Sequence, residues 1–203
     1  MNGITKEFID IFWNDIKDIF MDVFNEILAK EQLSETQRVS AIRIIYKKGD
    51  PTEMKNYRPI SLLNVDVKII TKALAIRLAD ALPDIIHNNQ KCIPGRHIVN
   101  NIHVVKDLIE LINKNEDEAA LIFLDQEKAF DRVDHDFLIK TLKAFGFGDY
   151  FIKWIKILFR NIESKVKVNG FTTKTFSIER GVRQGCPLSA LLYILVAEVL
   201  GIE

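Results

Sequence analysis

Residues 121–135 read LIFLDQEKAFDRVDH, and this stretch decides how the chain is interpreted. The apolar run that begins at Ala119 shows little alternation and ends at Asp125, a pattern typical of a short strand covered on both faces. Phe130 and another acid, Asp131, follow shortly afterwards. An acid at a strand end can begin a turn or bind a metal ion, and the stretch by itself leaves both interpretations open.

The composition is that of a globular protein without a membrane span. The chain has 203 residues, 48% of them hydrophobic and 28% charged, which is enough for one domain or two small lobes. It contains no run of about 18 apolar residues, and its first residues lack the order of a signal peptide. Cys92 and Cys186 are the only cysteines, so neither a disulfide framework nor a zinc ribbon is supported.

The charges are balanced overall but unevenly distributed. The net charge is zero, yet it amounts to −5 over residues 1–35, +7 over residues 36–106 and −2 over residues 107–203. A basic segment beside an acidic one can place phosphates next to metal-binding carboxylates. Solvated surfaces produce the same asymmetry, so the charge pattern is only weak support for a nucleic-acid partner.

Helical spacing of apolar residues predicts several helices. The first is amphipathic, has Thr5 as its N-cap and extends to about Leu28, and its apolar face is expected to pack in the core or against a partner. Four more are predicted with an N-cap at Asp66 and an end near Pro83, over residues 97–112, from Asp134 or Asp136 to Gly146, and with an N-cap at Asp149. A last apolar helix follows Pro187.

Strands are predicted to be few and short. RVSAIRIIYKKGDP (residues 38–51) and NYRPISLLNV (56–65) are expected to be extended, and residues 119–125 form the short apolar strand. SKVKVNGFTTKTFSI (164–178) predicts a hairpin that turns at Asn169-Gly170. The mixture of helices with short strands predicts an α+β fold.

Four of these segments together resemble the reverse transcriptase domain of non-LTR (LINE-type) retrotransposons. They occur in the family's order over residues 38–203. The resemblance implies a right-hand polymerase fold, helix-rich with short antiparallel strands: an N-terminal helical extension (residues 1–35), fingers (36–115) and an incomplete palm (116–203). The segments are YKKGDPTEMKNYRPISLLNVDVKIITKALAIRL (46–78), NNQKCIPGR (88–96), LDQEKAFDRVDHDFL (124–138) and GVRQGCPLSALLY (181–193).

The resemblance implies that Asp125 is one of three catalytic carboxylates that hold two Mg²⁺ ions, with the backbone carbonyl of Gln126 as a further ligand. Magnesium prefers oxygen ligands, and two ions suit attack of a primer 3′-hydroxyl on a nucleotide α-phosphate. The implied partners are an RNA template, a DNA primer, deoxynucleoside triphosphates (dNTPs) and the rest of a longer retrotransposon protein, including the remaining palm, a thumb and an endonuclease. The implied location is intracellular, nuclear and cytoplasmic.

The family also implies a dNTP pocket. Arg58 resembles the fingers arginine that grips the triphosphate, with Lys47 or Lys48 alongside; solvation remains an alternative for the lysines. Phe130 occupies the place of the aromatic that excludes a ribose 2′-hydroxyl, although a core role is also open. Gln184 and Gly185 are implied to line the pocket behind the nucleotide.

Two departures from the family pattern weaken individual assignments. Arg96 is implied to contact the template, but Lys91-Cys92-Ile93 stands where a Gly-Phe is often found. Ala190 replaces the proline that usually follows the serine, which we expect to be a mild change at the start of a helix.

No adjacent Asp-Asp pair occurs in the 203 residues, so the family's other two carboxylates are missing. We therefore expect a fragment that is truncated before the Ala-Asp-Asp motif and is inactive by itself. The alternatives are a degenerate remnant of an element that at most binds nucleic acid, a group II intron-type reverse transcriptase, and a helical interaction module.

Overall fold

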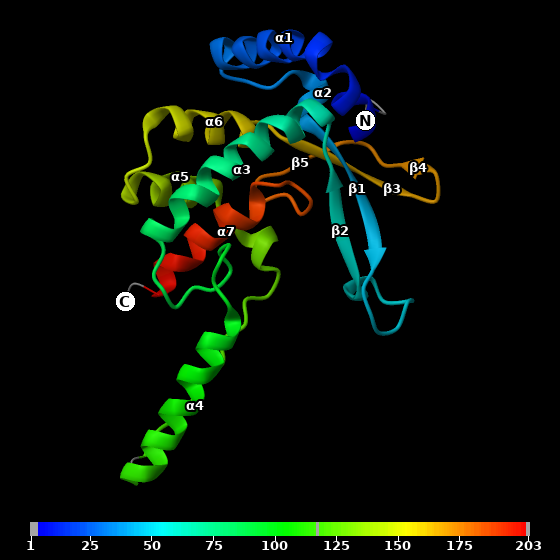
Figure 1. The fold of residues 1–203 in the computed structure, drawn as a ribbon. Coiled ribbons are helices and arrows are strands. Elements are labelled where there is room, and N and C mark those ends of the chain that lie inside the picture. The colour runs from blue at the N-terminus through cyan, green and yellow to red at the C-terminus, as the bar shows by residue number, and fades with distance from the viewer. Residues whose placement is uncertain (1–3, 117, 202–203) are drawn as a thin grey trace.

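Helices dominate the computed structural model, which describes residues 4–116 and 118–201 (Figure 1). Thr5 caps the first helix as predicted, because its hydroxyl accepts a hydrogen bond from the Phe8 amide. Within the described residues the α-helices are α1 (Lys6–Lys30), α2 (Glu35–Arg38), α3 (Val65–Ile85), α4 (Ile98–Asn115), α5 (His135–Ala144), α6 (Asp149–Phe159) and α7 (Ser189–Glu198); the 3₁₀ turns are η1 (Met54–Asn56), η2 (Ala129–Arg132) and η3 (Val199–Gly201).

The core lies between α3, α5, α6 and α7 (Figure 1). Helix α7 is apolar on every side, as expected of a helix surrounded by protein, and Leu192 and Leu195 are fully buried. The buried Glu198 carboxylate accepts a hydrogen bond from the His87 amide, which ties α7 to the loop after α3.

The sheet is small and mixed. Strand β1 pairs with β2 in the antiparallel sense and with β3 in the parallel sense, and the order is β2-β1-β3-β4, with β5 also paired to β3. Only antiparallel strands were predicted, so the parallel pairing of β1 with β3 was not expected. Most of the helical core lies between these two strands in the sequence, and local patterns do not report such a distant pairing. The strands are β1 (Val39–Tyr46), β2 (Tyr57–Leu62), β3 (Glu163–Val168), β4 (Phe171–Thr172) and β5 (Phe176–Ser177).

The predicted hairpin at Asn169-Gly170 is confirmed. Both residues have positive φ angles, 48° and 85°, and Val168 pairs with Phe171 across the two-residue turn. This geometry is the mirror-image turn that the Asn-Gly pair favours.

Three predicted features are wrong. Residues 119–125 form no strand: they pair with no described strand, and Leu124 is 93% exposed. An isolated extended segment has no neighbour for its amide and carbonyl groups, so an apolar sequence alone cannot make it a strand. The N-caps of α3 and α6 are Asn64 and Gly148, so Asp66 and Asp149 lie in the first turns instead.

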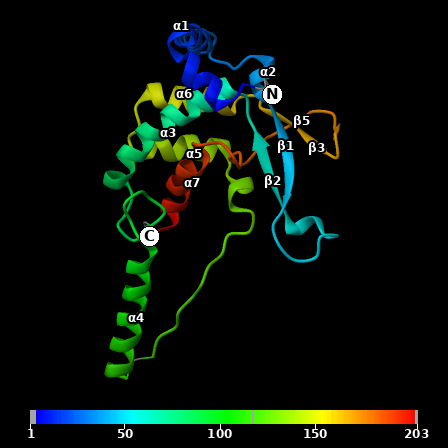
Figure 2. The ribbon, with the colours of Figure 1, turned by 45° about the vertical axis from the view of Figure 1, so that its right-hand side comes forward.

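Two helices extend beyond the core. Helix α4 has no buried residue and projects away from the rest of the chain (Figures 1 and 2). The predicted core stripe of α1 is buried only at Ile27, and Phe8 and Ile11 are exposed. Among the described helices, none is both long enough and apolar enough to cross a membrane.

Candidate functional site

Asp125 lies in an exposed segment just before η2, and its charge acts on Tyr193 of α7. The Tyr193 hydroxyl donates a hydrogen bond to the side-chain oxygen of Gln126. Burial raises the pKa of Tyr193, and the negative charge of Asp125 raises that pKa further. The middle of α7 thus meets the stretch that carries the predicted catalytic acid.

Phe130 packs on the same tyrosine. Its ring stacks on that of Tyr193 with centroids 5.0 Å apart and planes inclined by 20°. Phe130 is half-buried and contacts the edge of the hydrophobic core. The predicted core role and the predicted role at the sugar are therefore both compatible with its position.

The loop over residues 181–186 is tied to the turn that carries Phe130. The Gly181 amide donates to the Val133 carbonyl and the Val182 amide to the Phe130 carbonyl, both at 2.7 Å. Gly181 has a φ of +91°, and a Cβ there would lie 3.0 Å from the backbone of Asp131. The close approach of these two segments requires a glycine.

The same loop runs beside strand β2. The Ser61 amide donates to the Gln184 carbonyl at 2.7 Å, and the Gln184 side-chain amide donates to an Asp131 carboxylate oxygen at 3.3 Å. Gly185 has a φ of +101°, and a Cβ there would lie 2.8 Å from the Ser61 carbonyl oxygen. The structure thus brings Phe130, Gln184 and Gly185 together at the edge of β2.

Arg183, in the middle of this loop, is buried and was not predicted as a site residue. Its guanidinium donates to the Arg38 carbonyl at 3.2 Å, and its Nε has no hydrogen-bond partner among the described residues. Burial lowers the pKa of Arg183 to about 10. The bond to Arg38 fastens the loop to the residue that precedes β1.

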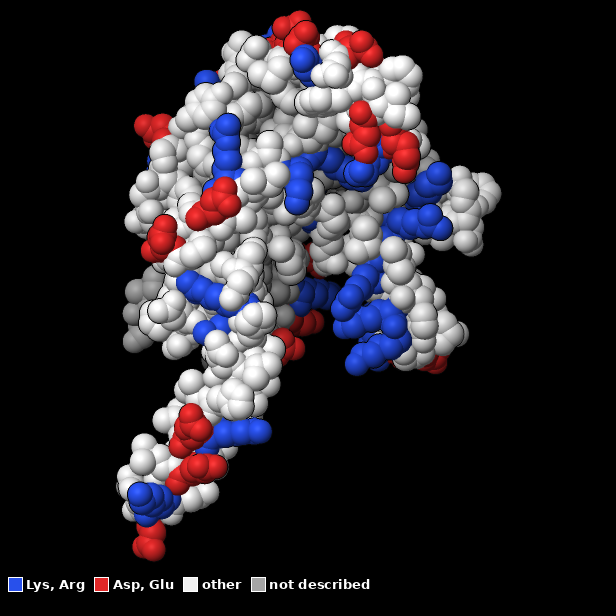
Figure 3. Space-filling view, in the orientation of Figure 1, with Lys and Arg blue, Asp and Glu red and all other residues white. Residues whose placement is uncertain are grey.

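Arg58, Lys47 and Lys48 are exposed on or beside the β1–β2 hairpin, where Lys and Arg gather along the inner edge (Figure 3). Arg58 lies on β2 two residues before Ile60, so the two side chains share one face of the sheet. The Ile60 side chain reaches within 3.2 Å of the position that a Cβ on Gly185 would take. Lys47 and Lys48 lie farther away, beyond the end of β1.

Three further cations share this face, and the sequence analysis missed them. Arg58 pairs with Ile45, Arg43 pairs with Ile60 and with Lys167, and Lys165 pairs with Ala41. Directly paired residues point to the same side, so Arg43, Arg58, Lys165 and Lys167 form one group, here called the sheet cations. None of them forms an ion pair within the described residues. The alternating basic residues in SKVKV were a signal that the sequence contained. The register between β1 and β3 could not be read from the sequence.

Arg96 has a different environment from the one implied by the family. Its guanidinium donates to the carbonyls of Pro83, Ile86, His87 and Gln90 at 2.7–3.1 Å. These carbonyls belong to the last turn of α3 and the loop after it, where helix carbonyls lack partners. Arg96 therefore holds this loop, and a template contact would have to use the same donors.

Asp125 and Gln126 do not by themselves complete a metal site. An exposed carboxylate and a backbone carbonyl are suitable ligands, so Asp125 and Gln126 fit as contributors. Within residues 4–116 and 118–201, however, no three acids, histidines or cysteines cluster closely enough to hold a metal ion.

The chain is similar to known proteins in both sequence and fold. The model of the family described as "Reverse transcriptase (RNA-dependent DNA polymerase)" matches residues 45–202. The chain is 41% identical over 199 residues to the Transposon TX1 uncharacterized 149 kDa protein of Xenopus laevis, covering 98% of this chain and 15% of that protein. It is 29% identical over 181 residues to the RNA-directed DNA polymerase from mobile element jockey of Drosophila melanogaster, covering 86% and 19%.

A solved structure of apo telomerase from Candida tropicalis, truncated from its C-terminal domain, has a similar fold. It superposes with a TM-score of 0.51 at 15% identity over 92% of this chain and 44% of that one. The chain spans less than a fifth of the length of the two transposon proteins. Because the family model covers most of the chain, the chain belongs to the reverse transcriptase family.

Proposed function

We propose that this chain contributes the fingers (residues 36–115) and the first part of the palm (116–203) to an RNA-directed DNA polymerase of a non-LTR retrotransposon. The observation that carries the proposal is the loop over residues 181–186, which joins the Phe130 turn to the edge of β2. A loop held on both sides provides a fixed surface on which a nucleotide can be positioned.

Asp125 is the proposed catalytic carboxylate, and Asp125 and the Gln126 carbonyl are proposed Mg²⁺ ligands. Bound Mg²⁺ would favour attack of the primer 3′-hydroxyl on the α-phosphate of the dNTP and would stabilise the leaving pyrophosphate. Two further carboxylates have to come from the rest of the longer protein. By itself, the 203-residue chain is therefore expected to extend no primer.

The phosphates of the dNTP and of the RNA template with its DNA primer are the proposed ligands of the hairpin. Arg58 offers a planar guanidinium that can bind a phosphate through two parallel hydrogen bonds, whereas Lys47 and Lys48 supply point charges. Gln184 and Gly185 are proposed to border the base, and Phe130 the sugar. The other sheet cations extend the positive surface from β2 to β3.

The test uses a longer retrotransposon protein that contains this chain and the two further carboxylates. Asp125→Asn keeps the size of the side chain but removes the charge that Mg²⁺ requires. Loss of several kcal/mol of transition-state stabilisation predicts a fall in extension rate of roughly 1000-fold or more, with template–primer affinity nearly unchanged. Asp107→Asn, at an exposed acid on α4, is the matched control. Near-normal extension by Asp125→Asn would show that Asp125 only ends the exposed segment and takes no part in catalysis.

A further inference from the structure

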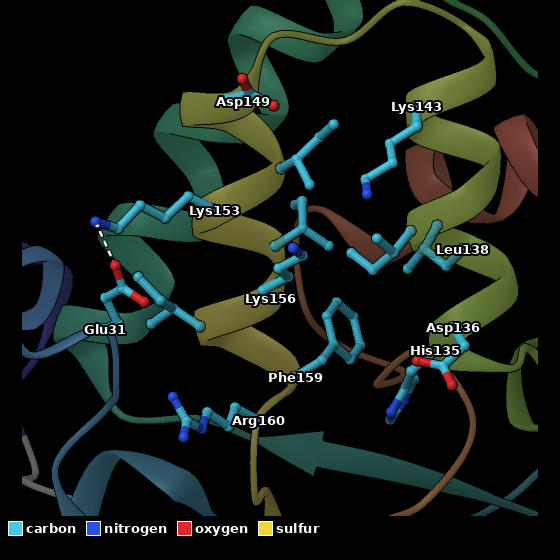
Figure 4. Close-up of a pocket in the computed structure, with 14 residues that line it drawn as sticks. Glu31, His135, Asp136, Leu138, Lys143, Asp149, Lys153, Lys156, Phe159 and Arg160 are labelled. Atoms are coloured by element: carbon cyan, nitrogen blue, oxygen red, sulfur yellow. Dashed lines mark ion pairs between the residues drawn. The ribbon is translucent and has the colours of Figure 1, made fainter.

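A cavity of about 540 Å³ opens between α5 and α6, and none of its lining residues belongs to the proposed nucleotide site (Figure 4). Four basic residues line it, one on α5 and three on or just after α6. The ammonium groups of Lys143 and Lys156 point into the space between the helices (Figure 4). The basic residues are Lys143, Lys153, Lys156 and Arg160.

Only one of these cations is neutralised by an ion pair. Lys153 pairs with Glu31 at 2.8 Å, whereas Lys143, Lys156 and Arg160 form no ion pair within the described residues. The pKa of Glu31 is lowered, first by its hydrogen bond to Lys153 and in smaller part by the charges of Arg160 and Lys156. The field at this end of the cavity is therefore positive.

The other acids lie at the rim. Asp149 is at the start of α6 with its carboxylate turned away from the cavity, and Asp136 is beside His135 on the opposite side (Figure 4). A helix N-terminus carries partial positive charge, which partly balances Asp149. Three unpaired cations thus face the solvent with two acids at the edges.

An aromatic pair forms one end of the cavity. The rings of His135 and Phe159 lie 4.8 Å apart and are inclined by 52°. The Phe159 ring faces the space between the helices, below the Lys156 side chain (Figure 4). Phe159 is half-buried, so part of its ring remains open to the cavity. Cations beside an accessible ring are the combination that binds single-stranded nucleic acids, because the ring stacks on a base while the cations hold phosphates.

We propose that the α5–α6 cavity is a second nucleic-acid site, which binds a single-stranded segment with a base on Phe159 and phosphates on Lys143, Lys156 and Arg160. It is separate from the sheet cations, and its existence does not depend on polymerase activity. The shared chemistry is a phosphodiester strand with an unpaired base, so RNA and DNA are both possible sources.

The binding test measures fluorescence anisotropy of labelled hexauridylate and hexadeoxyuridylate, which differ only in the sugar, against the 203-residue chain at several salt concentrations. Replacing Lys156 and Arg160 with Gln should weaken binding and make the slope of log K against log salt shallower by roughly 1.4, since each phosphate contact on a single strand contributes about 0.7. The matched control replaces Lys106 and Lys114, exposed on α4, with Gln and should leave both quantities unchanged. Stronger hexauridylate binding identifies RNA as the ligand, and the reverse identifies DNA.

Two further measurements separate this site from a general charge effect. Glu31→Gln removes the carboxylate that forms an ion pair with Lys153 and should tighten binding. A loss of folding would not produce this effect. Ultraviolet crosslinking of hexauridylate should modify the peptide that contains Phe159 or His135. The proposal would be overturned if the Lys156/Arg160 variant and the α4 control bound equally well. It would also be overturned if the crosslinks fell only in the three strands β1, β2 and β3. Either result would leave the proposed polymerase function intact.

Discussion

Phe130 packs against the edge of the core and is also predicted to border the sugar of the nucleotide, so its two possible roles need separate measurements. In the longer protein, Phe130→Ala should leave extension with dNTPs measurable but increase incorporation of ribonucleotides, because the ring that would meet a 2′-hydroxyl is gone. Tyr193→Phe is the control: it keeps the stacked ring and loses only the hydrogen bond to Gln126. If Phe130→Ala lowers the melting temperature without changing sugar selection, the ring serves only the core.

Gly185 is predicted to be irreplaceable for reasons of backbone geometry. A side chain there would combine a left-handed conformation with a Cβ only 2.8 Å from the Ser61 carbonyl oxygen. We expect Gly185→Ala to cost roughly 2–3 kcal/mol in urea unfolding, within the range for strained backbone positions. Gly170→Ala has a positive φ but open space around it, and should cost about 1 kcal/mol. Equal costs for the two variants would mean that the close approach to β2 contributes nothing.

The positions of some motif residues can be compared with the structure, whereas their functional roles stay predictions. Phe130, Gln184 and Gly185 were assigned by resemblance, and the structure places them together. Tyr193, Arg43 and Lys167 were not assigned, because their importance depends on the packing of α7 and on the register of β1 with β3. Neither the packing of α7 nor the register of β1 with β3 can be predicted from the local spacing of residues.

Asp134 is the side chain that starts helix α5, and it gives a pH-dependent prediction. Its carboxylate accepts a hydrogen bond from the Phe137 amide at 2.9 Å, which is the main reason that its pKa lies below the ordinary value of 3.8. A lowered folded-state pKa means that this stabilisation is present above pH 3.8 and disappears as the pH falls through the folded-state value.

Asp134→Ala should therefore lower the melting temperature at pH 7, with a difference from the unmodified chain that shrinks in acid. Asp136→Ala, in the first turn but without this cap, should have a smaller effect. A difference that stays constant from pH 7 to pH 3 would argue against the cap.

Elements with strong local signals were predictable, and those that need a distant partner were not. The first helix and the Asn169-Gly170 hairpin follow from capping and turn chemistry, which act within a few residues. Residues 119–125 have the composition of a buried strand, but they lie exposed because no described strand borders them. The parallel pairing of β1 with β3 likewise depends on how the intervening helices fold back.

At the scale of the whole molecule, a helical core carries a mixed sheet on one side, and Lys and Arg gather along the inner edge of the β1–β2 hairpin (Figures 1 and 3). The sheet cations come from three strands that are up to 124 residues apart, since Arg43 pairs with Lys167. The sequence places the excess of positive charge in residues 36–106. The fold adds Lys165 and Lys167 from a segment whose net charge is negative.

This arrangement predicts how the chain binds an RNA–DNA duplex. If the four sheet cations each neutralise one phosphate, log K should fall with log salt at a slope of roughly −3 to −4. Arg43→Gln with Lys167→Gln should make the slope shallower by about two, since each contact contributes about one. Lys106→Gln with Lys114→Gln removes the same charge from α4 and should leave the slope unchanged. Titrations by fluorescence anisotropy at five salt concentrations measure the slopes. If the two double variants give the same slope, the duplex does not lie on this face, and the shared orientation of the sheet cations has no part in binding it.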